Sequence, residues 1–205
     1  MNFQKLTENI RNKNITILGK RYSGKTILSI YFIIKNLEFF NNIYIFYPDF
    51  FSFHPYLPYL KKISKNIQIF YKNNFKDLKE TLANILENLN YRDLLFFDKF
   101  SLLLKLELEE RIKIYSNIMK FFLITTYIVK KFDGTILINY TSKENDKIIN
   151  ILKYWSDLLI NIDRNKNVLK LNILNLSEDK ETSLEIDLDY LFNIINYDRR
   201  IDHSV

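Results

Sequence analysis

Short apolar runs and longer helical patterns alternate along the first two thirds of the chain. An apolar run of about five residues predicts a buried parallel strand, because such a strand is covered on both faces of the sheet. Apolar residues that recur every three or four positions predict a helix. We therefore expect strands at 14–18, 43–47, 67–71, 93–98 and 135–140. Helices are expected at 2–11, 27–37, 75–89 and 107–131.

The last third of the chain has a different pattern. Strand-like segments follow one another with short polar connections, which is typical of antiparallel hairpins. They are expected at 155–162, 168–174 and 183–188. Alternating strands and helices followed by such strands predict an α/β fold, with a mainly parallel central sheet extended by antiparallel C-terminal strands. We expect one domain over residues 1–190 and a C-terminal tail over residues 191–205.

The composition excludes several kinds of site. The chain has 205 residues, no cysteine and two histidines, which excludes disulfides, thiolate metal sites, cysteine nucleophiles and a histidine metal cluster. The stretch 1–13 is polar and lacks the apolar core of a signal peptide. The longest apolar-rich stretch, 121–129, is too short to span a bilayer. We therefore expect a cytoplasmic protein, nucleoid-associated in a prokaryote, with no membrane partner.

Charge is spread unevenly along the chain. The net charge is +6, but residues 178–202 hold eight acids and three bases. The rest of the chain therefore carries +11. A basic body with an acidic end is compatible with a nucleic acid or an acidic protein as partner. Lysines that only keep an apolar protein soluble give the same composition, so both explanations stay open.

The strongest chemical signal lies between the first expected strand and the helix after it. Two of the chain's three glycines stand there, in the spacing G-x-x-x-x-G-K-[ST] of the phosphate-binding P-loop. The backbone N–H groups of such a loop and the N-terminus of the next helix bind phosphate. Lys25 is expected on the β- and γ-phosphates and Thr26 on the metal, so the predicted cofactors are ATP and Mg²⁺. The predicted nucleotide-binding residues are Gly19, Lys20, Arg21, Tyr22, Ser23, Gly24, Lys25 and Thr26.

Polar residues follow other expected strands. Asp98 ends an apolar run and is expected to be the second Mg²⁺ ligand, because ligands bind at the carboxyl edge of open α/β sheets. Asp49 follows the second strand and is the candidate catalytic residue that activates water; a turn-forming role after Pro48 is the alternative. Asn139 or Thr141 either senses the γ-phosphate or only ends its strand.

Several segments, taken in order, carry a family resemblance. They are Ile17–Leu28, Tyr44–Leu57, Leu94–Lys105, Glu109–Ser142 and Tyr154–Ile173. They are similar to the Walker A motif, the segment with the catalytic Glu, the Walker B motif, the long helix with its following strand, and the C-terminal antiparallel strands of RecA-type recombinases. The archaeal RadA and eukaryotic recombinase-paralogue branch is the most similar. The resemblance implies a RecA-like P-loop ATPase core.

Several positions depart from the family pattern. Pro48 or Asp49 stands at the position of the catalytic Glu. Tyr140 stands at a usual Gln, and Lys99 stands where Ser commonly follows the Walker B Asp. The resemblance therefore implies an ATP-binding accessory paralogue in homologous recombination or DNA repair, with weak or no DNA-linked ATP hydrolysis. Its implied partner is a recombinase or another paralogue subunit.

The family's two DNA-binding loops correspond to residues 105–110 and 140–154, both without the family's glycines. Lysines in or beside the second loop are candidates for salt-dependent contacts to the backbone of single- or double-stranded DNA. They are Lys143, Lys147 and Lys153. Tyr140 or Tyr154 is a candidate for stacking on bases; solvated lysines and a packed tyrosine are the alternative.

Two other functions are compatible with the sequence. A P-loop small-molecule kinase generally needs an arginine-rich lid, and the clustered arginines here are Arg199 and Arg200 near the C-terminus. A scaffold subunit that binds nucleotide without hydrolysing it needs no catalytic carboxylate, which agrees with the departures from the family pattern.

Overall fold

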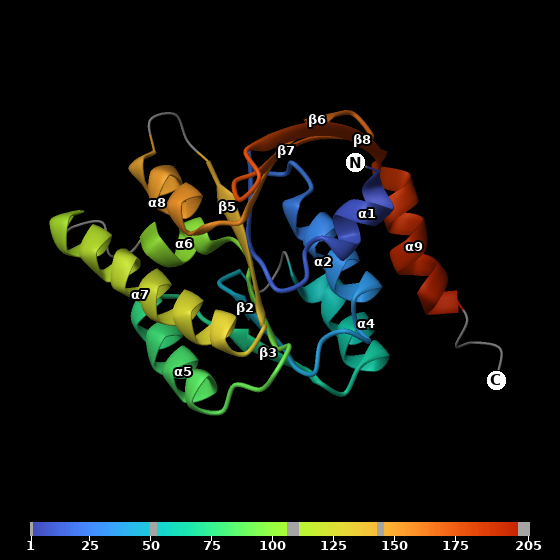
Figure 1. Cartoon of the computed structure of the whole chain (residues 1–205). Coiled ribbons are helices and arrows are strands. Elements are labelled where there is room, and N and C mark those ends of the chain that lie inside the picture. Colours follow the sequence, from blue (N-terminus) through green and yellow to red (C-terminus); the bar gives the residue numbers. More distant parts are fainter. Residues whose placement is uncertain (1, 50–52, 106–110, 143–145, 201–205) are drawn as a thin grey trace.

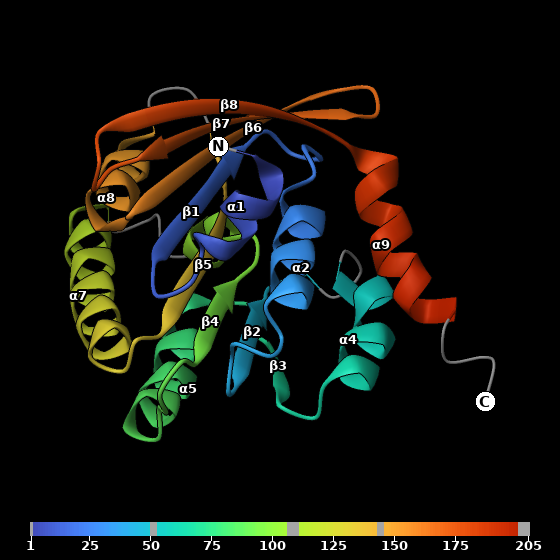
Figure 2. The same cartoon turned by 45° about the vertical axis from the view of Figure 1, so that its right-hand side comes forward.

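A mixed β-sheet with helices on both faces forms the centre of the computed structural model (Figures 1 and 2). The structure describes residues 2–49, 53–105, 111–142 and 146–200. In this part of the chain the sheet has eight strands, in the order β3-β2-β4-β5-β1-β6-β7-β8. The bounds are β1 Asn14–Gly19, β2 Ile43–Tyr47, β3 Ile67–Tyr71, β4 Leu94–Phe97, β5 Thr135–Thr141, β6 Leu158–Asn165, β7 Val168–Asn175 and β8 Lys180–Asp187.

Strand direction divides the sheet into two parts. From β3 to β6 all neighbouring strands pair in parallel. The pairs β6–β7 and β7–β8 are antiparallel, which fits their short connections. The predicted α/β fold with a mainly parallel sheet and antiparallel C-terminal strands is therefore confirmed.

The helices form one layer on each face of the sheet, as the turned view shows most clearly (Figure 2). One layer contains α1 Phe3–Glu8, α2 Lys25–Lys35, α4 Leu57–Ile63, which follows the short helix η1 His54–Tyr56, and α9 Leu188–Arg200. The other contains α5 Phe75–Glu87, α6 Phe100–Lys105, α7 Arg111–Lys131 and α8 Lys147–Trp155. Within the described residues, none of these helices is both long and apolar enough to cross a membrane.

The central strands supply both hydrophobic cores. Ile45 and Phe96 belong to the core under α2, whereas Phe46 and Phe97 belong to the core under α5 and α7. Successive side chains of a strand point to opposite faces, so one apolar run fills both cores. The rings of Phe46 and Phe97 stack with centroids 5.0 Å apart. Strands buried on both faces explain why the sequence pattern here is a continuous apolar run.

Helical segments of the structure differ from the prediction in three places. Residues 57–63 form α4, where no helix was expected from the sequence; Pro58 lies in the first turn, where its missing N–H needs no partner. Trp155 ends α8 and does not begin a strand, and β6 starts at Leu158. The segment expected to be a tail from residue 191 is helical up to Arg200 and belongs to α9.

Candidate nucleotide-binding site

The loop between β1 and α2 has a shape that depends on its glycines. Gly24 has a φ of 93°, in the left-handed region that favours glycine. A Cβ atom on Gly19 would lie 2.6 Å from Ser23 Oγ and 2.7 Å from the carbonyl oxygen of Ile162. Helix α2 begins at Lys25, directly after the loop. Because the first N–H groups of a helix lack partners within it, this end of α2 is suited to bind phosphate.

Lys25 is folded back onto the loop. Its Nζ donates to the carbonyl oxygens of Gly19 at 2.9 Å and Lys20 at 2.6 Å, and to Ser23 Oγ at 3.3 Å. Burial lowers the pKa of Lys25 to about 8, the charge of Asp98 raises it, and the charge of Lys99 lowers it further. Among the described residues, the hydrogen-bond partners of this buried ammonium group are neutral oxygens, so it is suited to receive an anion.

Asp98 connects the P-loop helix with the centre of the sheet. It follows β4, and its Oδ1 accepts hydrogen bonds from Thr26 Oγ1 at 2.9 Å and Asn139 Nδ2 at 2.8 Å. Ser29 Oγ in turn donates to Asn139 Oδ1 at 2.8 Å. The structure thus brings together two predicted metal ligands, Thr26 and Asp98, and one predicted polar residue of β5, Asn139.

The second carboxylate oxygen of Asp98 fits a metal ion. Burial raises the pKa of Asp98, while hydrogen bonds from Asn139 and Thr26 and the charges of Lys99 and Lys25 lower it. Among the described residues, no group donates a hydrogen bond to this buried Oδ2. A buried polar atom without a partner is costly, and Mg²⁺ prefers oxygen ligands. Asp98 and Thr26 are therefore the residues suited to hold the Mg²⁺ of a bound nucleotide.

Nucleotide oxygens would have to complete such a metal site. In the part of the chain that the structure describes, no group of three or more His, Cys, Asp or Glu side chains could hold a metal ion. Mg²⁺ is commonly bound by one or two protein oxygens together with substrate phosphates and waters. Thr26 and Asp98 would be the protein ligands of such a nucleotide-bound Mg²⁺.

Asp49, the candidate catalytic residue, is engaged in an ion pair. It lies two residues after the end of β2, and its Oδ2 is 2.6 Å from Lys99 Nζ. The strands β2 and β4 are neighbours, and the N–H of Asp98 donates to the carbonyl oxygen of Phe46 at 2.8 Å. This pairing brings the segments that follow the two strands together. A carboxylate bound to an ammonium group is a poor base, because the positive charge stabilises its ionised form.

Two features of the site were not found by sequence reasoning. Ser29 donates a hydrogen bond to Asn139. Its position one turn after Thr26 on α2 could have indicated that it lies on the same face of the helix. Lys99 was noted only as a departure from the family pattern. Its pairing with Asp49 depends on the adjacency of β2 and β4, which no local pattern indicates.

The candidate DNA-contact residues are only partly described. Lys147 and Lys153 are exposed on α8, and Lys143 lies outside the described residues. The first candidate loop also falls largely outside them. Tyr140 is buried and donates a hydrogen bond from its hydroxyl to Asp146 Oδ2 at 2.5 Å, so for Tyr140 the structure supports the alternative of a packed tyrosine. Tyr154 is 75% exposed.

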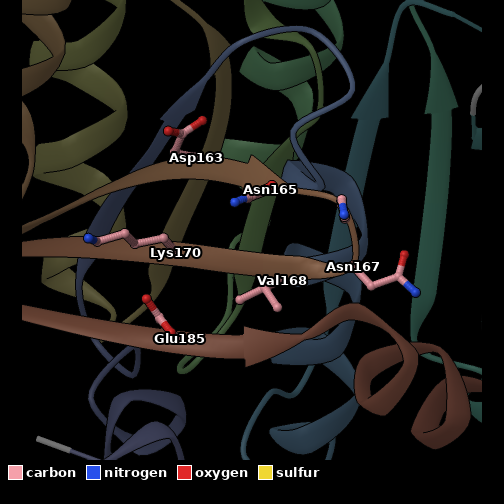
Figure 3. Close-up of a pocket in the computed structure, with 7 residues that line it drawn as sticks. Asp163, Asn165, Asn167, Val168, Lys170 and Glu185 are labelled. Carbon is pink, nitrogen blue, oxygen red and sulfur yellow. The ribbon is translucent and has the colours of Figure 1, made fainter.

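A groove of about 940 Å³, lined mainly by polar residues, lies on β6, β7 and β8 (Figure 3). Asp163, Lys170 and Glu185 stand in register across these strands and line it. On the hairpin's other face, Arg164 donates to the carbonyl oxygen of Tyr22 at 3.4 Å and Leu169 lies against Gly24. Because alternate residues of a strand point to opposite faces, the groove and the P-loop lie on different sides of this hairpin.

Comparisons with known proteins bear on the fold. No protein-family model matches the sequence, and no curated protein matches it. In structure, 429 solved chains match, so the fold is a widespread one. One of them is the crystal structure of the RadB recombinase, with a TM-score of 0.69 and 12% identity over 87% of this chain and 88% of that chain. At this identity the likeness is one of fold, and it confirms the predicted RecA-like core.

Proposed function

We propose that this protein binds ATP with Mg²⁺ at the P-loop. The observation that carries the proposal is the hydrogen bond between Thr26 and the buried Asp98, whose second oxygen has no donor among the described residues. In P-loop proteins a Thr or Ser and an Asp at these positions hold the metal ion. Lys25 adds a buried cation at the same place. Lys25 thus offers a positive charge to the phosphates, and Asp98 offers a negative charge to the metal ion.

We further propose that the protein is an accessory recombinase paralogue in homologous recombination or DNA repair. Its fold is shared with the RadB recombinase. One fold hosts many functions, so this likeness supports the proposal without carrying it. The proposed partners are a recombinase or another paralogue subunit, together with single- or double-stranded DNA, in the cytoplasm. Recovery of a full-length recombinase in a pull-down from the native host tests the partner.

Slow or absent ATP hydrolysis is the third part of the proposal. A group that activates the attacking water must be free to accept a proton or orient the water. Asp49, the nearest candidate, is paired with Lys99 at 2.6 Å. Brisk ATP turnover that is lost in Asp49→Ala contradicts this part of the proposal. It does not contradict the proposed nucleotide binding.

Lys25→Ala tests nucleotide binding directly. We expect its affinity for ATP with Mg²⁺ to fall by about tenfold or more, because charge-assisted hydrogen bonds to phosphate are lost. The measurement is isothermal titration calorimetry of the variant and the wild type. Lys61→Ala, an exposed lysine on α4, is the control and should bind like the wild type. Unchanged affinity in Lys25→Ala contradicts the proposal.

A non-hydrolysing scaffold subunit is the second candidate function, and the Asp49–Lys99 pair favours it. In that case the bound nucleotide stabilises the subunit and is not turned over. A bound ligand raises the unfolding temperature through its affinity for the folded state. We expect saturating ATP to raise the unfolding temperature with no release of phosphate, whereas measurable turnover favours a slow ATPase.

A further inference from the structure

Lys99 has an unusual position at the edge of the sheet. It directly follows the proposed metal ligand Asp98, and its φ of 47° lies in the left-handed region that residues other than glycine rarely adopt. Its carbonyl oxygen accepts the N–H of Leu102 at 2.8 Å, so the start of α6 holds this backbone in place. Residues kept in such a conformation cluster at functional sites.

The ammonium group of Lys99 lies beside Asp49, close enough to Lys25 and Asp98 for its charge to act on both. Nζ is 2.6 Å from Asp49 Oδ2, and both side chains are only partly exposed, by 23% and 32%. The charge of Lys99 also acts on both Lys25 and Asp98. Two lysines from different elements therefore converge here. Each is bound by oxygens of the protein itself, Lys25 by the P-loop and Lys99 by Asp49.

We propose that Lys99 senses the terminal phosphate of ATP, and that this phosphate competes with Asp49 for the Lys99 ammonium group. A terminal phosphate carries more negative charge than a carboxylate and offers three acceptor oxygens. Lysine is a point charge on a flexible stem, so it can exchange one oxygen for another. The inference depends on the proposed binding of ATP at the P-loop.

This exchange distinguishes ATP from ADP. ADP has no terminal phosphate at this position, so it leaves Lys99 on Asp49. With ATP, Lys99 exchanges between Asp49 and the terminal phosphate, so the Asp49 carboxylate is released for only part of the time, in agreement with slow hydrolysis. The Asp49–Lys99 pair then opposes binding of the triphosphate, because the ammonium group must leave a partner that it already has. Removing the charge of Asp49 should therefore strengthen the binding of ATP and leave that of ADP nearly unchanged.

The experiment compares affinities for ADP and for an ATP analogue with a non-hydrolysable β–γ bridge, both with Mg²⁺, by isothermal titration calorimetry. In Lys99→Met we expect the analogue to bind about tenfold or more weakly, because a charge-assisted contact is lost, and ADP to change by less than about twofold. Lys99→Arg keeps the charge and should keep the discrimination. Asp49→Asn should bind the analogue about threefold or more tightly relative to ADP.

Lys130→Ala is the matched control. Lys130 pairs with Asp157 at 3.1 Å, and Asp157 Oδ2 accepts the N–H of Asn14 at the start of β1, the edge opposite the P-loop. Its removal also deletes one positive charge and one ion pair with Asp. We expect the affinities of this variant for ADP and for the analogue to match those of the wild type. A changed ratio of the two affinities would mean that net charge alone distinguishes ATP from ADP, which overturns the inference.

The remaining outcomes separate this inference from the proposed function. If Lys99→Met weakens the analogue and ADP equally, Lys99 does not sense the terminal phosphate. The same follows if Asp49→Asn leaves the ratio of the two affinities unchanged. In either case the proposed binding of ATP still stands if Lys25→Ala loses affinity. No binding of either ligand by the wild type overturns both. Thermal unfolding of each variant shows whether it is folded, and Asp49→Asn tests the competition independently of any change at position 99.

Discussion

Residues of the candidate site that contact one another come from distant parts of the chain. Asp98 and Asn139 are 41 positions apart, and Lys99 and Asp49 are 50 apart. The P-loop is different, because Lys25 binds oxygens only a few positions away. A motif of neighbouring residues can be recognised from sequence, since its geometry is local. The partners of Asp98 and Lys99 depend on which strands lie side by side.

At this scale, Asp98→Asn tests the metal site. The amide keeps one oxygen for Thr26 and Asn139 but removes the charge that attracts Mg²⁺. We expect the affinity for ATP in Mg²⁺ to fall by about tenfold or more, to its value in EDTA, because a charged ligand of the metal is lost. The measurement is calorimetric titration with and without Mg²⁺.

The same variant has a predictable effect on stability. Burial raises the pKa of Asp98, so the folded state disfavours the ionised form and the neutral amide relieves this cost. The unfolding temperature without Mg²⁺ should therefore stay the same or rise. A variant that loses affinity equally in EDTA and in Mg²⁺ would contradict the metal role and indicate a distorted P-loop.

At the scale of elements, α9 shows how a helix is missed. A C-terminal tail was expected from residue 191, yet Leu188, Leu191 and Ile195 have helical spacing and are buried in the core beside α2. The rings of Tyr31 on α2 and Tyr190 on α9 have centroids 6.5 Å apart. Packing against α2 decides the structure of this segment, and composition alone does not reveal it.

Leu191→Ala tests whether α9 contributes to stability. Leu191 is fully buried, so the free energy of unfolding should fall by about 2–5 kcal/mol through lost burial and the cavity left behind. Urea unfolding followed by circular dichroism measures the change. The control is Phe192→Ala on the next residue, which is 42% exposed and should cost less than about 1 kcal/mol. Equal costs would mean that α9 does not pack as described.

At the scale of the whole molecule, acidic side chains of the C-terminal part and the lysines of α8 lie on different elements. Three acidic residues of the C-terminal part lie on β8 and Asp189 lies in the first turn of α9, whereas Lys147 and Lys153 lie on α8, in the helix layer on the other face of the sheet from α9. The two exposed lysines give α8 positive charges that a polyanion can contact.

DNA binding, if it uses this region, should depend steeply on salt. Each phosphate contact that a lysine makes contributes about −0.7 to −0.9 to the slope of log affinity against log salt concentration. Lys147→Ala and Lys153→Ala should each weaken binding and reduce the slope by about 1. Fluorescence anisotropy with a labelled oligonucleotide measures both. Lys61→Ala on α4, in the opposite helix layer, is the control, and an affinity insensitive to salt would contradict phosphate contacts.

The sequence by itself determined the strands, the P-loop and the alternation of elements, because each depends on neighbouring residues. Apolar runs had to be buried on both faces, and the two glycines allowed the loop shape at 19–24 that larger side chains would disturb. Only the tertiary structure decided the order of the strands, the helices α4, α8 and α9, and the partners of Asp98 and Lys99. These depend on contacts between segments far apart in the chain, which local patterns do not contain.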